Sequence, residues 1–331
     1  MKKLIAILSI FVVLCAGLAF KSQKAAETIV IYTSTEDYNI ELLQEKLKDK
    51  FPNYNIDIEY LSTSNIATKI LEEGSRTECD IVFALDYAYI DKLIAADTLA
   101  SFEGRYNLSV FAADTINESN RDFVLPTIRS GGGIIINKKV LEEKHIEIPS
   151  SYEDLLDPQF KQLISMPSPK SSGTGYMFYL SLVNSWGEEK ALEYFDQLAK
   201  NVNGFTSSGS GPVNAISQNE VAVGLGMISQ ATEKITAGND NIEILFFEEG
   251  APYSLYGTSI VKGKETKPKV MEVMDFLYDY YINEACQTFY PELIFKGKNY
   301  VVENFPPNIK YSNMNNNTLE RKENLLTKWS H

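Results

Sequence analysis

Apolar runs typical of strands and helix-spaced apolar positions alternate along the first third of the chain. Three short segments are either continuously apolar or alternate apolar with polar residues, as strands do. Each precedes a segment with helical spacing of its apolar residues, such as Leu42, Leu43 and Leu47. We expect strands at 28–32, 56–60 and 80–84, and helices at 40–50, 66–73 and 87–95. This order predicts an α/β fold with a mainly parallel sheet covered by helices.

Two of the predicted strands end in polar loops that belong at one edge of the sheet. Thr33-Ser34-Thr35 follows the first strand, and Leu85-Asp86-Tyr87 follows the third. Ligands of such sheets bind beyond the carboxyl ends of the strands. We therefore expect both loops at the mouth of one binding site.

A second set of elements follows three consecutive glycines. Gly131-Gly132-Gly133 precedes an apolar strand pattern, Ile-Ile-Ile-Asn at 134–137, and predicts a flexible crossing. Residues 256–261 are a candidate for a returning strand. A capping box formed by Ser150 and Glu153 predicts a helix start. Further strands are expected at 221–227 and 242–246, and further helices at 212–218, 267–283 and 319–329.

The length of the chain favours two lobes. Without its N-terminal segment it has a little over 300 residues, more than one compact core usually holds. We expect a signal peptide and short linker at 1–26, a first lobe formed by 27–129 plus 258–331, and a second lobe at 130–257.

The N-terminal segment has the features of an export signal. Lys2 and Lys3 precede an apolar stretch from Leu4 to Leu14, which is too short to span a bilayer comfortably. Small residues follow at 17 and 19, where a signal peptidase would cleave. The protein is therefore expected to be periplasmic or extracellular. A lipid anchor at Cys15 stays open, although Leu14 stands where a lipoprotein signal has a small residue.

Charge and composition exclude several classes of function. The formal net charge of −13 disfavours nucleic acid and anionic membrane surfaces as partners. With only His145 and His331, neither a zinc site nor a Ser/His/Asp triad can be assembled, so we expect no catalysis, no metal and no cofactor. Cys79 and Cys286 are expected as buried free thiols, with a disulfide between them left open.

Two hydroxyl- and glycine-rich loops are the strongest candidates for ligand contacts. Residues 171–176 read Ser-Ser-Gly-Thr-Gly-Tyr, and residues 207–212 read Ser-Ser-Gly-Ser-Gly-Pro. Each is expected to open an amphipathic helix. Such a loop presents free backbone N–H groups, hydroxyls and the positive end of a helix dipole to one point. A pair of them predicts a site for an anionic group, while ordinary helix capping is the alternative.

These segments, taken in order, resemble the extracellular solute-binding proteins of ABC importers, type II. The similarity is greatest to the branch that holds ferric-ion, 2-aminoethylphosphonate and sugar-phosphate receptors. It covers nearly the whole chain after the signal and runs through residues 31–34, 79–82, 149–155, 169–176, 208–226 and 321–329. The resemblance implies a two-lobed periplasmic-binding-protein type II fold with a two-strand hinge. It also implies an ABC importer permease as the membrane partner, and no catalysis.

The resemblance also bears on the ligand. Iron-binding members use a His, a Glu and two adjacent Tyr, at positions that align with Glu36, Leu85, Ser229 and Gln230. These side chains do not supply the set of anionic oxygens that ferric ion needs. The anion contacts of the family do match, at Ser172-Gly173-Thr174 and at Ser208-Gly209. A small phosphonated or phosphorylated solute is thus the expected ligand.

Further contacts are expected around the anion. Arg129 could pair with a phosphate, with a surface ion pair as its alternative, and Glu36, Asp37 or Asp86 could hold an ammonium group. Tyr32 and Tyr87 could wall the cleft, although Tyr32 could equally be a core residue. The expected ligand-binding residues are Thr33, Ser34, Thr35, Glu36, Asp86, Tyr87, Arg129, Ser172, Gly173, Thr174, Ser208, Gly209, Ser210 and Gln230.

The expected function is capture of a small anionic solute by a monomeric substrate-binding component of an ABC importer. Two alternatives stay open. One is ferric iron held through a different ligand set or a bound anion, and the other is a secreted phosphate-ester hydrolase. The sequence alone does not distinguish a phosphonate from a sugar phosphate.

Overall fold

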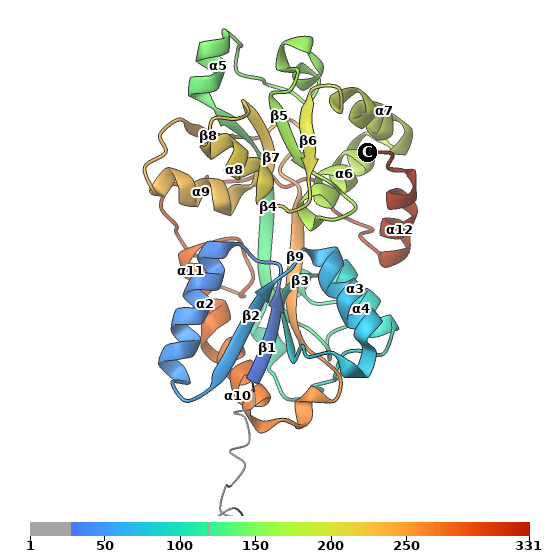
Figure 1. Ribbon diagram of the computed structural model, residues 1–331, viewed down its shortest axis with the longest axis vertical. Coiled ribbons are helices and arrows are strands. Elements are labelled where there is room, and N and C mark those ends of the chain that lie inside the picture. The colour runs from blue at the N-terminus through green and yellow to red at the C-terminus, as the bar shows by residue number, and fades with distance from the viewer. Residues whose placement is uncertain (1–27, 118) are drawn as a thin grey trace, which may run out of the picture.

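The computed structural model describes residues 28–117 and 119–331 (Figure 1). The expected signal peptide and Cys15 lie outside these residues. Within the described ranges, none of the helices has both the length and the apolar character needed to cross a bilayer.

The described chain alternates strands and helices for most of its length. The strands are β1 (Thr28–Thr33), β2 (Asn55–Tyr60), β3 (Ile81–Asp86), β4 (Leu125–Asn137), β5 (Ile164–Pro167), β6 (Val202–Thr206), β7 (Val223–Met227), β8 (Ile242–Leu245) and β9 (Tyr253–Ile260). The helices are α2 (Asp37–Lys50), α3 (Thr63–Glu73), α4 (Tyr87–Ala95), α5 (Lys138–Lys144), α6 (Gly173–Trp186), α7 (Glu188–Leu198), α8 (Gly211–Ser217), α9 (Ile228–Thr236), α10 (Pro268–Phe276), α11 (Ile282–Thr288) and α12 (Leu319–Lys328). A π-helical segment at Leu277–Tyr281 joins α10 to α11, so the helix expected at 267–283 is longer and irregular.

The molecule has two lobes, and β4 and β9 run between them (Figure 1). In the first lobe the strand order is β2-β1-β3-β9-β4, with β1 parallel to both β2 and β3. Successive residues of β1 enter different cores: Ile29 and Ile31 pack with α2 and α10, whereas Tyr32 packs with α3 and α4. Both faces of this sheet are therefore covered by helices, as the alternation of strands and helices predicted.

The second lobe repeats this arrangement around the far end of β4. There β4 pairs antiparallel with β7 and β8, and β5 pairs parallel with β6 and β7. Ile134 and Ile136 face the core that contains α6 and α7, whereas Ile135 faces α8 and α9. The fold is thus α/β and two-lobed with two crossing strands, which confirms the expected fold class.

The three glycines lie inside the crossing strand β4, at the point where it passes from one lobe to the other. Gly131 pairs with Tyr253 of β9, and Gly132 pairs with Met227 of β7. A Cβ atom on Gly132 would lie 2.6 Å from the Cε atom of Met177. Close packing against α6 therefore accounts for a glycine at 132.

Two further helices differ in kind from the sequence-based expectation. Helix α6 is buried from Gly173 to Val183 rather than amphipathic, because its residues pack into the second core while its start lies against Thr63 and Asp86 of the first lobe. The helix expected from Ser150 is only a 3-10 turn at Asp154–Leu156. Its capping acid is Asp154, which accepts hydrogen bonds from the backbone N–H and the hydroxyl of Ser150, in place of the expected Glu153.

The C-terminal helix belongs in part to the second lobe. Leu325 and Trp329 lie in the core that contains α6 and α7, and the indole ring of Trp329 contacts the rings of Tyr179 and Phe195. Figure 1 shows α12 beside α6. The expected lobe boundaries stay a prediction. Residues 258–331 were expected in the first lobe, whereas α12 packs in the second core. Cys79 and Cys286 are buried free thiols, as expected.

Candidate functional site

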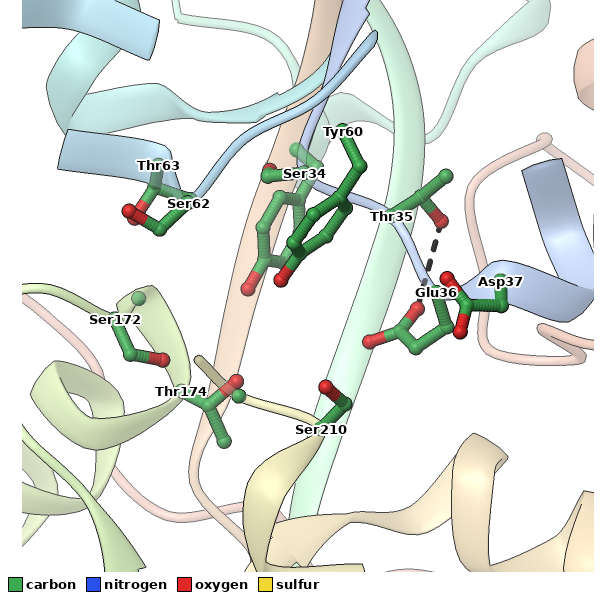
Figure 2. Close-up of a pocket in the computed structure, with 13 residues that line it drawn as sticks. Ser34, Thr35, Glu36, Asp37, Tyr60, Ser62, Thr63, Ser172, Thr174 and Ser210 are labelled. Atoms are coloured by element: carbon green, nitrogen blue, oxygen red, sulfur yellow. Dashed lines mark hydrogen bonds between the residues drawn. The ribbon is translucent and has the colours of Figure 1, made fainter. Parts of the chain in front are cut away.

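A cavity of about 260 Å³ lies between the lobes. The first lobe contributes the loop after β1 and the loop after β2, and the second lobe contributes the starts of α6 and α8. Figure 2 shows these side chains pointing toward one another across the gap. The lining residues are Ser34, Thr35, Glu36, Asp37, Tyr60, Ser62, Thr63, Ser172, Gly173, Thr174, Gly209, Ser210 and Tyr256.

Four helix N-termini meet at this cavity. The residue that precedes the first turn of each helix lines it: Glu36 for α2, Ser62 for α3, Ser172 for α6 and Ser210 for α8. The first backbone N–H groups of a helix have no partner within the helix, and the helix dipole makes this end positive. Each of these ends contributes partial positive charge and free N–H groups to the cavity, and no lysine or arginine is among its lining residues in the described chain.

Two hydroxyl groups at the start of α3 have no hydrogen-bond partner within the described residues. The Ser62 Oγ and Thr63 Oγ1 atoms are buried, and Ser62 does not cap the helix with its side chain. Other hydroxyls of the cavity are engaged: Ser34 Oγ donates to the carbonyl of Ala84 at 2.8 Å, and Ser172 Oγ accepts from the N–H of Gly175. Because a buried hydroxyl without a partner destabilises the fold, the pair is suited to a ligand that accepts hydrogen bonds.

An acidic group lies opposite the second-lobe loops. Glu36 Oε2 accepts a hydrogen bond from the Tyr290 hydroxyl at 3.0 Å. It accepts a second one from Thr35 Oγ1 at 3.4 Å (Figure 2). Burial raises the pKa of Glu36, and these hydrogen bonds oppose the rise. Asp37, which is exposed, stands at the rim. The cavity therefore has a hydroxyl- and N–H-rich end and a carboxylate end.

Two tyrosines complete the wall of the cavity. Tyr60 ends β2 and is 40% exposed, and Tyr256, on the crossing strand β9, is buried. Burial raises the pKa of both phenols, and the nearby Glu36 adds to this rise. Both phenols are thus neutral at ordinary pH and can donate a hydrogen bond to a ligand.

The structure brings most of the expected site residues together. Of the fourteen, the cavity is lined by Ser34, Thr35, Glu36, Ser172, Gly173, Thr174, Gly209 and Ser210. Three more stand directly behind the lining. Thr33 Oγ1 accepts from the N–H of Thr35, the Ser208 and Ser210 hydroxyls are hydrogen-bonded to each other, and Gln230 Nε2 donates to the carbonyl of Ser210.

Three expected contacts lie elsewhere. Asp86 is fully buried beneath the cavity. Its carboxylate accepts the N–H of Ala88 as the cap of α4 and pairs with Lys322 at 3.4 Å. Tyr87 points into the first lobe and donates to the carbonyl of Thr115. Arg129 forms an ion pair with Asp114 at 2.5 Å, the alternative left open from the sequence. Tyr32 is a core residue.

Sequence reasoning missed Ser62, Thr63, Tyr60 and Tyr256. The helix after β2 was expected from residue 66, whereas it begins at Thr63, so its first turn was assigned to a loop. A signal was present, since Ser62-Thr63-Ser64 follows its strand just as Thr33-Ser34-Thr35 does. The approach of Tyr256 depends on the path of β9 and has no local signal.

Hydrogen bonds between the lobes flank the cavity. Ser64 Oγ of α3 donates to the carbonyl of Ser171 at 3.2 Å, and the Tyr38 hydroxyl of α2 donates to Ser229 Oγ of α9 at 3.1 Å. The two lobes are thus in direct polar contact on both sides of the ligand space. The structure accordingly represents a closed arrangement of the lobes.

A family model of bacterial extracellular solute-binding proteins matches residues 79–322. The chain belongs to this family. It is a substrate-binding component of an ABC importer, with a small-molecule ligand and a membrane permease as partners, and it works in the extracellular or periplasmic space.

Two further proteins are similar to this chain in sequence. An uncharacterized protein of Haemophilus influenzae is 25% identical over 256 residues, which are 76% of this chain and 72% of that protein. A protein of Salmonella paratyphi A, provisionally named as a 2-aminoethylphosphonate-binding periplasmic protein, is 22% identical over 234 residues. That match covers 69% of this chain and 64% of the Salmonella protein.

Solved structures show the same fold. The periplasmic binding protein P5PA superimposes with a TM-score of 0.79 at 22% identity, covering 91% of this chain and 98% of its own. AfuA of Actinobacillus pleuropneumoniae, with fructose-6-phosphate bound, gives 0.80 at 22% identity, covering 91% and 97%. Iron-bound HitA of Pseudomonas aeruginosa gives 0.71 at 16% identity, covering 91% and 97%. The chain thus has the two-lobed type II periplasmic-binding-protein fold.

Proposed function

We propose that this protein, acting as a monomer, captures a small phosphonated or phosphorylated solute between its lobes for import, without chemical change. The phosphoryl group would lie at the end formed by Ser62, Thr63 and Ser172-Gly173-Thr174. The remainder of the solute would extend toward Glu36. The names of the Salmonella relative and of the fructose-6-phosphate complex of AfuA support a ligand of this class.

The observation that carries the proposal is the pair of unpartnered buried hydroxyls at the start of α3, which faces the start of α6. A tetrahedral oxyanion offers several acceptors to such donors and to the free N–H groups beside them. A Cβ atom on Gly173 would lie 3.3 Å from the Tyr256 hydroxyl, so glycine lets the start of α6 lie close to this phenol. Glycine also leaves the N–H groups of the first turn of α6 uncovered by a side chain at this position.

The acidic end limits what the rest of the solute can be. Glu36 and Asp37 would repel a second anionic group and would favour an ammonium or hydroxyl group that donates hydrogen bonds. An aminophosphonate and a sugar phosphate both have this polarity, with an anion at one end and donors at the other.

Ferric iron is the second candidate, because one cluster offers oxygen ligands. The Tyr290 hydroxyl lies 3.0 Å from Glu36 Oε2 and 3.4 Å from the Tyr38 hydroxyl. Burial raises the pKa of both phenols well above its ordinary value, and the carboxylate of Glu36 raises it further. This works against the phenolates that a ferric site needs. Among residues 28–117 and 119–331, no group of three His, Cys, Asp or Glu side chains suitable for a metal is found.

Calorimetry with matched solutes tests the proposal. We expect 2-aminoethylphosphonate or fructose 6-phosphate to bind at micromolar affinity or tighter, roughly −8 kcal/mol. Ethanolamine and fructose, which lack the phosphoryl group, should bind far more weakly. Ethylphosphonate, which lacks the ammonium, should fall between them if Glu36 holds that group.

Ferric citrate is the discriminating control. It should give neither comparable heat nor a phenolate-to-iron absorption band. Silent organic ligands together with tight ferric binding would refute the proposal and assign Glu36, Tyr38 and Tyr290 as the ligands to mutate.

A further inference from the structure

A buried lysine on the C-terminal helix lies behind the floor of the cavity. Lys322 is 1% exposed, although it lies on a helix whose neighbouring Glu323 is exposed. Its ammonium nitrogen is 3.4 Å from Asp86 Oδ1, which also accepts the N–H of Ala88 at the start of α4. A lysine is almost never buried to this extent without a charged partner.

Two aromatic rings from different lobes enclose the same ammonium. Its nitrogen lies 4.0 Å from the ring centroid of Tyr89, on α4 of the first lobe. It lies 4.4 Å from the ring centroid of Tyr176, on α6 of the second lobe. Both distances are within the range of a cation–π contact, and such contacts are strongest where water is excluded. One ammonium group therefore links both lobes.

The place of this link is next to the anion-binding end of the cavity. The Asp86 Cβ atom would be 3.8 Å from a Cβ atom on Gly173, the first residue of α6. Tyr176 stands one turn further along α6, and Thr63 Cγ2 is 3.6 Å from the same point on Gly173. The starts of α3, α4 and α6 thus meet at Gly173, one turn before Tyr176, whose ring the ammonium group contacts.

The helix that carries Lys322 is itself anchored in the second lobe. Leu325 and Trp329 hold α12 in the core that contains α6 and α7. A second, exposed ion pair joins the same helix to α4, between Glu323 and Lys92 at 3.4 Å. Helix α12 is therefore fixed to one lobe by apolar packing and joined to the other lobe by charge.

We propose that Lys322 is a positioning residue of the binding site, whose ammonium group clamps the start of α6 against the start of α4 and so stabilises the closed arrangement of the lobes. Asp86 is the acceptor of this clamp. The proposal rests on the proposed binding function only where ligand affinity is the readout, because closure is measurable without a ligand.

The test compares two variants with the parent protein by small-angle scattering and calorimetry. The double variant Asp86→Asn/Lys322→Met removes the ion pair without leaving a buried charge, and Asn can still cap α4. The control Glu323→Gln removes only the exposed pair on the same helix. Lys322→Met alone would leave Asp86 unpaired and is therefore expected to fold less well.

We expect the double variant to be folded but more open. Its radius of gyration should exceed that of the parent and of Glu323→Gln, both without added solute and with saturating 2-aminoethylphosphonate. Its affinity for 2-aminoethylphosphonate should fall at least about tenfold, whereas Glu323→Gln should stay within about twofold.

Failure of the clamp and failure of the ligand assignment give different results. If the folded double variant keeps the parent's radius of gyration, the clamp is refuted, whatever its thermal midpoint. If 2-aminoethylphosphonate does not bind even to the parent protein, the ligand assignment fails, and the scattering of the two variants still tests the clamp.

Discussion

Replacing Thr63 by valine removes one oxygen atom from the cavity at almost constant shape. Thr63 is 5% exposed, begins α3, and its Oγ1 atom has no partner in the described chain. The substitution therefore breaks no hydrogen bond seen in the protein. Threonine and valine have similar helix propensities, so the helix start is also little affected.

Thr63→Val should weaken binding without lowering the stability of the free protein. A hydrogen bond to a charged ligand contributes about 1.5–3 kcal/mol, so affinity for 2-aminoethylphosphonate should fall roughly ten- to 150-fold. The free protein should keep its thermal midpoint or gain slightly, because a buried hydroxyl without a partner is destabilising. A residue with only a structural role would not separate the two quantities in this way.

Thr232 offers a matched control. It is 3% exposed, its Oγ1 atom also lacks a partner among the described residues, and it lines a different groove, on α9. Thr232→Val should resemble Thr63→Val in thermal unfolding but leave the affinity measured by calorimetry unchanged. Equal affinity in Thr63→Val and the parent protein would remove the start of α3 from the binding site and refute the reasoning.

Three further perturbations have defined outcomes. Glu292 is buried, accepts the N–H of Gly131 on the crossing strand at 2.9 Å, and has its pKa raised from 4.5 to about 7 by burial. The folded protein binds the Glu292 proton more tightly than the unfolded chain does, so the free energy of unfolding should fall as pH rises from about 4.5 to 7. In urea unfolding, Glu292→Gln should be more stable than the parent at pH 8 and show little difference at pH 4.5; an equal gap at both pH values would contradict this. Trp329 is 2% exposed, and Trp329→Ala should lower the free energy of unfolding by about 3–5 kcal/mol because it leaves a cavity in the core. A loss below about 1 kcal/mol would mean that Trp329 does not anchor α12 there. Gly132→Ala should destabilise by about 1–3 kcal/mol, since its Cβ would lie 2.6 Å from Met177, and an unchanged thermal midpoint would show that α6 can yield.

The fold could be predicted from local patterns because each lobe repeats them. Continuous apolar runs such as 80–84 indicate strands covered on both faces, and the structure confirms β3 with every residue buried. The two serine- and glycine-rich loops are likewise recognisable, since capping and backbone exposure are local properties. Eight of the expected site residues accordingly line one cavity.

What the sequence did not indicate depends on contacts between distant segments. Asp86 ends β3 at the expected edge of the sheet. Its carboxylate pairs with Lys322, 236 residues later, and does not line the cavity. Helix α6 was expected to be amphipathic, yet it is buried because α12 and the first lobe cover its other faces. The start of α3 was missed because Ser62 precedes a polar first turn, without the apolar spacing that marked residues 66–73.

A crystal structure of the complex with 2-aminoethylphosphonate tests the central claim most directly. The account predicts the phosphorus atom between the starts of α3 and α6, with its oxygen atoms within about 3.2 Å of Thr63 Oγ1 and of the N–H groups that follow Ser172. The ammonium nitrogen should lie within hydrogen-bond distance of Glu36. A phosphonate bound at the Glu36 end, or a ligand that contacts neither helix start, would contradict the account.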